Sequence, residues 1–116
     1  MKNSQLYKGS LNTIIMKLLE ENGKMYGYEI TQRIKELSDG KILIKEGSLY
    51  PALHKLEADG LLESEQLEVN GRLRKYYKLT KKGKQDSVQA LNELISFLQT
   101  INLIINPKQS LSYGGI

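Results

Sequence analysis

Apolar residues follow a helical pattern in the first third of the chain. From Leu11 to Leu19 they are spaced three and four residues apart, which places them on one face of an amphipathic helix. Asn22-Gly23 is expected to end this helix, because both residue types tolerate a positive φ. A second helix is predicted from about Tyr26 to Leu37, and Ser38-Asp39-Gly40 ends it.

A third helix is indicated by leucines at helical spacing and by its end signals. Ser48 is expected to cap its N-terminus, and Pro51 to lie in the first turn, where a missing N–H costs no hydrogen bond. Gly60 is expected to terminate it. Between the second and third helices, the run from Lys41 to Lys45 is rich in β-prone residues and is predicted to form a short strand.

Two further β-prone runs, about Leu61 to Val69 and Arg72 to Leu79, are joined by Asn70-Gly71. An Asn-Gly pair between extended runs is a strong hairpin signal, because a type I′ turn needs a positive φ at both central residues. Thr80 is then predicted to cap a long last helix, which Pro107 stops.

The last helix carries more apolar surface than so small a core can use. Its apolar residues alternate steps of three and four, as in a heptad repeat. An exposed seam of this length would be an aggregation liability in a monomer, so we expect it to hold two copies together. The predicted dimer-interface residues are Leu91, Leu94, Ile95, Leu98, Ile101 and Ile105.

The predicted order of elements is helix, helix, short strand, helix, hairpin and long helix. This order indicates a mainly α fold with a small β-hairpin, namely a winged helix-turn-helix followed by a long C-terminal dimerisation helix. The predicted boundaries are 1–80 for the winged helix-turn-helix, 81–106 for the dimerisation helix and 107–116 for a flexible tail.

Composition excludes several classes of function. The chain has 116 residues and no cysteine, so disulfides and thiolate metal sites are ruled out. With one histidine and scattered carboxylates, no metal-binding or catalytic constellation is found, and we expect no enzyme, no metal and no cofactor. No apolar run approaches the roughly 20 residues that cross a bilayer, and the N-terminus lacks a secretory signal. A cytoplasmic protein without membrane contact is therefore predicted.

Positive charge is concentrated in and after the predicted hairpin. The net charge is +4, and positions 70–84 contain seven lysines and arginines and no acidic residue. Because this run follows the third helix directly, we expect the helix to enter the major groove of double-stranded DNA while the hairpin reaches the backbone or the minor groove. The predicted DNA-binding residues are Ser48, Tyr50, Pro51, His54, Lys55, Asn70, Gly71, Arg72, Arg74 and Lys75.

Two assignments stay open on the sequence alone. His54, the only histidine, either reads a base or senses pH, or is a partly exposed surface residue, which is the commoner case. Of Tyr26 and Tyr28, one is expected in the core and the other against phosphate.

Three stretches resemble the PadR-like family of bacterial transcription regulators. They read YGYEI at 26–30, GSLYPALHKLE followed by GLL at 47–62, and RKYYKLT with a glycine at 74–83. The resemblance extends from about Leu6 to Ile105, and the length matches the short subgroup with a single C-terminal helix. It implies a winged helix-turn-helix, a dimerising C-terminal helix and, usually, repression relieved by a small ligand.

The resemblance also implies roles for particular residues. Tyr50 with its neighbours would contact DNA, and so would the predicted hairpin around Arg72, which is the wing of the winged helix-turn-helix. Some short members bind flat aromatic compounds in a dimer-interface cavity lined with tryptophan. This chain has no tryptophan and one phenylalanine, Phe97, so that binding mode is not carried over, and Phe97 only marks the candidate ligand pocket.

The leading hypothesis is a sequence-specific transcriptional regulator that binds an inverted-repeat operator as a homodimer. By resemblance it is a repressor, released by a small-molecule effector that the sequence does not identify. The alternative is a winged-helix protein–protein interaction module without DNA binding. Such a module has no need of a basic hairpin, so the charge favours the regulator, and replacing Arg72 and Arg74 by alanine separates the two.

Overall fold

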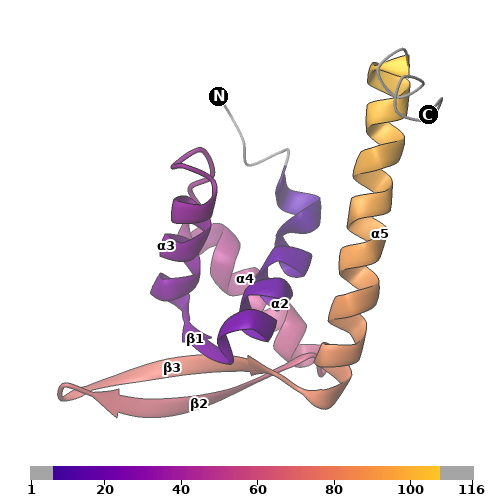
Figure 1. Cartoon of the computed structure of the whole chain (residues 1–116). Helices are drawn as coiled ribbons and strands as arrows, with labels where there is room; N and C mark the ends of the chain where they lie inside the picture. Colours follow the sequence, from indigo (N-terminus) through magenta and orange to yellow (C-terminus); the bar gives the residue numbers. More distant parts are fainter. Residues whose placement is uncertain (1–6, 108–116) are drawn as a thin grey trace.

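The computed structural model describes residues 7–107. Along the chain, the elements are the 3-10 turn η1 (Lys8–Ser10), α2 (Leu11–Asn22), β1 (Lys24–Tyr26), α3 (Gly27–Leu37), α4 (Glu46–Ala58), β2 (Leu62–Val69), β3 (Arg72–Leu79) and α5 (Lys81–Ile105). The predicted fold class is confirmed: three helices, a hairpin and a long C-terminal helix form a winged helix-turn-helix with α5 appended (Figure 1).

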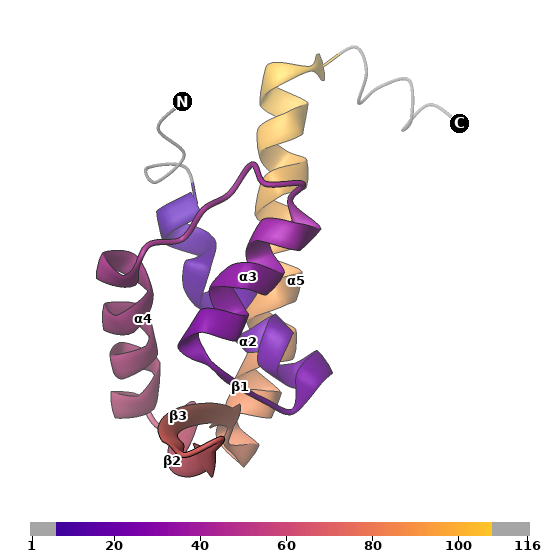
Figure 2. The same cartoon turned by 90° about the vertical axis from the view of Figure 1, so that its left-hand side faces the viewer.

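The core lies between α2, α3, α4 and one face of the sheet. Figures 1 and 2 show the three helices gathered over the inner end of the sheet, with the hairpin of β2 and β3 projecting beyond them. Their predicted apolar faces are buried, with Ile15, Ile30 and Leu53 fully enclosed, and Tyr77 of β3 closes the core on the side of the sheet. Burial of these faces holds the elements together, because none is stable alone.

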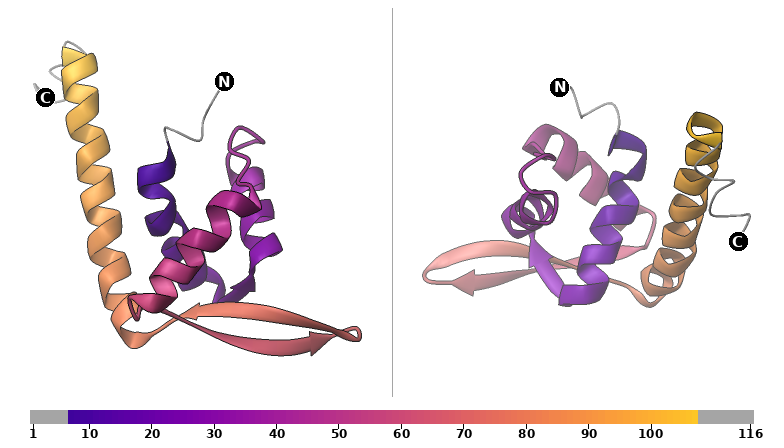
Figure 3. Two further views of the ribbon diagram at one scale, coloured as in Figure 1. Left: turned by 180° about the vertical axis from the view of Figure 1, so that it is seen from behind. Right: turned by 45° about the horizontal axis from the view of Figure 1, so that its top comes forward.

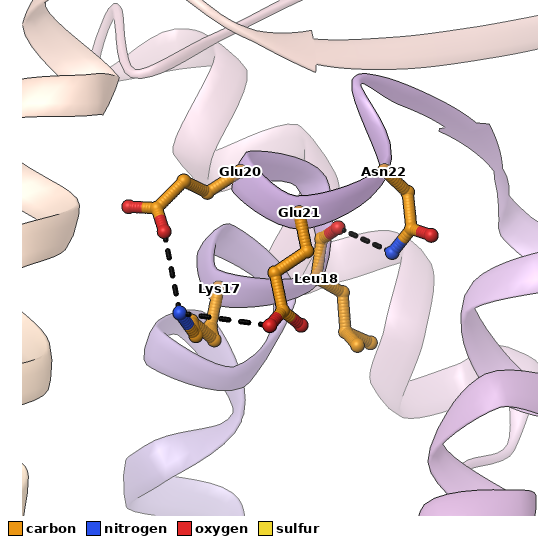
Figure 4. A network of polar contacts seen from close by, with 5 residues as sticks. All are labelled: Lys17, Leu18, Glu20, Glu21 and Asn22. Carbon is orange, nitrogen blue, oxygen red and sulfur yellow. Dashed lines mark hydrogen bonds and ion pairs between the residues drawn. The ribbon is translucent and has the colours of Figure 1, made fainter.

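Helix α2 ends at Gly23, as predicted, because Gly23 adopts a φ of +83°. Figure 4 shows the polar contacts of its last turns. Lys17 Nζ lies 3.3 Å from a carboxylate oxygen of Glu20 and 3.7 Å from one of Glu21, and Asn22 donates a hydrogen bond of 2.7 Å to a backbone carbonyl one turn back. The hydrogen bond to Glu20, together with its charge, raises the pKa of Lys17. These contacts are on the surface, so they contribute little stability.

The sheet has three antiparallel strands in the order β1-β3-β2. In its register Tyr26 faces Tyr76, and Val69 faces Arg72 at the hairpin end. Asn70 and Gly71 have φ values of +53° and +79°, as a type I′ turn requires, so the hairpin prediction is confirmed.

The predicted strand at Lys41–Lys45 is wrong. This run is an irregular connection, and a third strand, β1, lies before α3 instead. Ile44 is buried, and Ile42 packs against the core, so these apolar side chains anchor the connection without pairing its backbone. Strand β1 takes the edge of β3 because its central residue, Met25, is buried opposite Tyr77.

Helix α4 begins earlier than predicted. Its N-cap is Lys45 and its first residue Glu46, so Ser48 is the third helical residue and its side chain does not cap the helix. Pro51 is the sixth residue, in the second turn, and leaves the carbonyl of Gly47 without its helical N–H partner. Gly47 is exposed, so water can bond this carbonyl.

The start of α5 is fastened to the end of α4. Thr80 caps α5 as predicted: its Oγ1 accepts a hydrogen bond from the N–H of Gly83 (3.0 Å) and donates one to the carbonyl of Gly60 (2.6 Å). The N–H of Thr80 also donates to the carbonyl of Leu61 (3.0 Å). Gly83 lies so close to this same carbonyl that a Cβ would overlap it. From this junction α5 runs alongside α2 (Figure 3).

Helix α5 is long and apolar enough, by length and composition alone, to cross a membrane, and no residue in its most apolar 18-residue stretch is buried. The prediction that no segment reaches such a length is therefore wrong. A stripe of polar residues follows one side of the helix, consisting of Gln85, Gln89, Asn92, Glu93, Ser96 and Thr100. Such a stripe is typical of a helix with one side in water. Apart from Pro107, the predicted flexible tail lies outside the described residues.

Candidate nucleic-acid interface

Helix α4 turns its leucines inward and leaves the opposite side uncovered. Leu49, Leu53 and Leu56 are at most 2% exposed. On the far side of the helix, Pro51 and His54 are exposed. Toward the start of α2, the uncovered side is bounded by a groove lined by Tyr7, Leu11, Asn12, Gly47, Ser48, Pro51, Ala52 and Lys55. The predicted α4 residues Ser48, Pro51 and Lys55 thus lie together along one groove.

Tyr50 lies on the other flank of α4, against α3. It is half-buried, and its hydroxyl would come within 2.5 Å of a Cβ at Gly27, so any side chain at position 27 would require the Tyr50 ring to shift. The ring of the exposed His54 lies 6.3 Å from that of Tyr50, between centroids. Tyr50 therefore serves packing as well as offering a hydroxyl at the edge of the uncovered face.

The predicted wing residues do not share one surface. Side chains alternate along β3, so Lys75 and Tyr77 face the helices while Arg74 and Tyr76 face the other way. Lys75 Nζ lies 3.8 Å from a carboxylate oxygen of Glu57 in α4 and 5.4 Å from the ring centroid of Tyr77. Burial raises the pKa of Tyr77, as expected for a core phenol.

Acidic partners from other elements compensate part of the basic run. Within the run, Lys78 Nζ lies 3.5 Å from a carboxylate oxygen of Glu63 on β2. Outside the run, Lys24 Nζ of β1 lies 3.1 Å from a carboxylate oxygen of Glu65, also on β2. At the hairpin end, Asn70, Gly71 and Arg72 are all exposed, and within residues 7–107 no ion pair or hydrogen bond engages the Arg72 side chain. Arg72 is therefore the wing cation best placed to meet an external anion.

The two tyrosines that the sequence left open have different environments. Tyr28 is 64% exposed at the start of α3. Tyr26 is half-buried, with its ring edge-on to Tyr76 at 5.3 Å and the guanidinium carbon of Arg74 4.5 Å from its ring centroid. Sequence reasoning missed this cluster because β1 itself was missed; strand alternation across Lys24–Tyr26 would have placed Tyr26 on the sheet surface.

The predicted dimer seam on α5 is divided between two environments. Leu91, Leu94 and Ile101 are half-buried, on the side of the helix that includes its buried residues Gly83 and Ser87. The other three predicted residues are exposed by 47 to 67%: Ile95, Leu98 and Ile105. Leu98 and Ile105 follow Leu91 by seven and fourteen residues, so they lie on the same side of the helix as Leu91, and only Ile95 is turned to an adjoining side. The apolar side of α5 that meets the chain's own core is therefore itself partly open farther along the helix.

Phe97 is 59% exposed. It borders a wide-open depression over the polar stripe of α5, together with residues such as Gln89 and Glu93. In the part of the chain that the structure describes, no group of three or more potential metal ligands is found.

The chain matches known proteins over most of its length. The sequence profile of the transcriptional regulator PadR-like family matches residues 15–89. An uncharacterised protein of Lysinibacillus sphaericus is 33% identical over 106 residues, which span 90% of this chain and 96% of the relative. A transcriptional regulator of Mycobacterium tuberculosis is 43% identical over 76 residues, or 63% of this chain and 68% of the relative.

Solved structures agree with these sequence matches. A transcriptional regulator from Clostridium thermocellum has a TM-score of 0.78 at 36% identity, covering 85% of this chain and 96% of that one. A PadR-like transcription factor from Bacteroides fragilis has a TM-score of 0.70 at 38% identity, covering 88% and 96%. These relatives are regulators rather than enzymes, in agreement with the sequence prediction. The chain belongs to the PadR-like family of transcriptional regulators.

Proposed function

We propose that this transcriptional regulator binds a specific double-stranded DNA operator through α4 and the wing, as a cytoplasmic homodimer. The observation that carries the proposal is that α4 has an uncovered face and is followed directly in the chain by the hairpin of β2 and β3. At the tip of this hairpin, Arg72 is exposed and makes no ion pair or hydrogen bond within the described residues. A helix fits the width of the major groove, and an exposed arginine beside it suits a phosphate or the minor groove.

Individual side chains on α4 support this use. His54 and Lys55 are exposed and offer donors to base edges or phosphates. Lys55 is paired with Asp59 at 3.3 Å, but both side chains are largely in solvent, so DNA can displace this weak contact. Tyr50 adds a hydroxyl from the flank of the helix.

The open apolar face of α5 supports dimerisation. Val88, Ile95 and Leu98 are each about half exposed, and with Leu91 they follow the three-four spacing of a helix-pairing seam. A second copy would cover this face and leave the polar stripe in water. A bilayer would instead surround the stripe with hydrocarbon, where its amide and carboxylate groups find no partners. We therefore assign the face to a second copy of the chain.

A two-fold dimer implies an inverted-repeat operator, with half-sites separated by roughly 34 Å, one turn of DNA. Repression, and release by a small molecule, rest on the family resemblance. Near Phe97 the single chain offers only an open depression, so an effector site here would need walls supplied by the second copy.

The test is fluorescence anisotropy of the purified protein with duplex DNA from upstream of its own gene, titrated across a salt series against a scrambled duplex. We expect tighter binding to the native duplex, saturation at one dimer per site and a linear fall of log affinity with log salt. Failure of the folded dimer to bind either duplex at low salt would reject DNA binding and favour the protein-interaction module. Arg72→Ala is expected to weaken binding while the protein stays folded.

A further inference from the structure

The guanidinium of Arg74 is engaged by another side chain of the protein at the surface of the sheet. Its central carbon lies 4.5 Å from the ring centroid of Tyr26, the distance of a cation–π contact. The ring of Tyr26 in turn meets Tyr76 edge-on at 5.3 Å. Arg74 and Tyr76 are two residues apart on β3, so they lie on the same face of the sheet, and the Tyr26 ring contacts both.

Tyr26 belongs to two elements at once. It is the last residue of β1, paired with Tyr76, and the N-cap residue of α3. Its backbone N–H donates to a carboxylate oxygen of Glu29 in the first turn of α3 (3.1 Å). A contact on the Tyr26 ring therefore connects the wing to the start of α3.

The projecting hairpin is thus held from both faces. On the helix side, Lys75 reaches Glu57 of α4. On the opposite side, Arg74 reaches Tyr26 at the start of α3. The hairpin is otherwise a two-stranded ribbon beyond the end of β1, and such ribbons twist and bend easily without further support. These two contacts are therefore expected to help fix the direction of the hairpin relative to α4, beside the hydrogen bond of 2.6 Å that Ser64 of β2 donates to Glu57.

We propose that Arg74 is a positioning residue that fixes the wing against Tyr26, and that it makes no direct contact with DNA. This inference rests on the proposed DNA binding and assigns the phosphate contact of the wing to Arg72 alone. It departs from the sequence prediction, which counted Arg74 and Lys75 among the DNA contacts together with Arg72.

The test compares the salt dependence of DNA affinity in matched variants of the full chain. Removing a lysine or arginine that contacts phosphate lowers the slope of log affinity against log salt by about one. We expect this for Arg72→Ala. For Arg74→Ala we expect affinity about two- to five-fold weaker, from the size of an exposed cation–π contact, with the wild-type slope. Arg33→Ala removes the same charge from α3, where Arg33 pairs with Glu36, and is expected to change neither quantity.

A double-mutant cycle tests the partner. Tyr26→Leu is expected to weaken binding as much as Arg74→Ala, the double variant no further, and Tyr26→Phe to retain wild-type affinity because the ring remains. A lowered slope for Arg74→Ala would show a direct phosphate contact and overturn the inference, as would unchanged affinity. The salt-slope comparison and the double-mutant cycle both start from wild-type protein that binds the operator. If the wild type does not bind, the proposed DNA binding fails, and this result is distinct from a failure of the inference about Arg74.

Discussion

Gly83 shows how one residue can be fixed by its surroundings. It lies in the first turn of α5, where the backbone of the turn after α4 leaves no room for a side chain. The obstructing atom is the carbonyl oxygen of Leu61, which is itself bonded to the N–H of Thr80. A backbone atom held in this way cannot move aside as a side chain would. Glycine here is therefore a requirement of close packing rather than of backbone conformation.

We expect Gly83→Ala to lower the free energy of unfolding by about 1–3 kcal/mol, the usual cost of overpacking. Urea denaturation followed by circular dichroism measures it. Gly47→Ala is the matched control: nothing lies within 4 Å of its Cβ position and it sits in the first turn of a helix, so it should cause no loss of stability. Equal stability of Gly83→Ala and wild type would contradict the packing argument.

At the scale of single residues, the sequence predicted caps and turns better than contacts between residues that are far apart in the chain. Thr80 was identified as a cap and Asn70-Gly71 as a turn, because each depends on local backbone geometry that the residue type itself favours. The pairing of Arg74 with Tyr26 depends on strand pairing between segments far apart in the chain. No local pattern contains that information, so the sequence could not separate Arg74 from the other basic residues of the hairpin.

Among the elements, α5 depends most on its first turn. Thr80→Ala removes the oxygen that accepts from Gly83 and the hydroxyl that donates to Gly60. We expect a loss of about 1–2 kcal/mol in the free energy of unfolding, typical of a lost N-cap. Thr80→Ser keeps both hydrogen bonds and should retain most of the stability in the same denaturation experiment. Similar losses for the two variants would mean that the methyl group, not the hydroxyl, matters.

The open face of α5 gives the second prediction at this scale. Leu98→Glu places a charge on a side chain that is 56% exposed in one chain and covered in the proposed dimer. We expect light scattering after gel filtration to show twice the chain mass of 13.2 kDa for the wild type and the single-chain mass for the variant. Gln89→Glu adds the same charge on the polar stripe and should stay dimeric. Dissociation of both variants, or of neither, would place the interface elsewhere.

Elements were predictable where pattern and end signals agreed. The three core helices and the hairpin were located within a few residues, because periodicity and turn residues marked the same boundaries. Lys41–Lys45 was misassigned because buried isoleucines in a loop look the same in sequence as those in a strand. The heptad seam was recognised on α5, but which of its residues pack on the chain's own core and which stay open depends on where α2 lies.

For the whole molecule, dimerisation and stability should be linked. A chain whose long helix exposes so much apolar surface gains stability by mass action when a second copy covers it. We expect the melting temperature of the wild type to rise with protein concentration over a hundred-fold range in calorimetry. The Leu98→Glu variant should melt at a lower temperature that does not depend on concentration. A wild-type melting temperature that does not change with protein concentration would indicate that the folded chain is stable without a second copy covering α5.

The junction of Thr80 and Gly83 with the turn after α4 has a mechanical consequence. It bonds the start of α5 directly to the turn after α4, so a change in the direction of one helix is passed to the other. At 1.5 Å per residue, the 25 residues of α5 extend about 37 Å, so a tilt of about 5° at one end displaces the other by about 3 Å. In a symmetric pair, any molecule that slightly changes how two α5 helices cross would change the spacing of the two α4 helices by a comparable amount. That is a large fraction of a base-pair step, so the proposed dimer would lose its proposed fit to two successive grooves of DNA without a change in the fold of either chain.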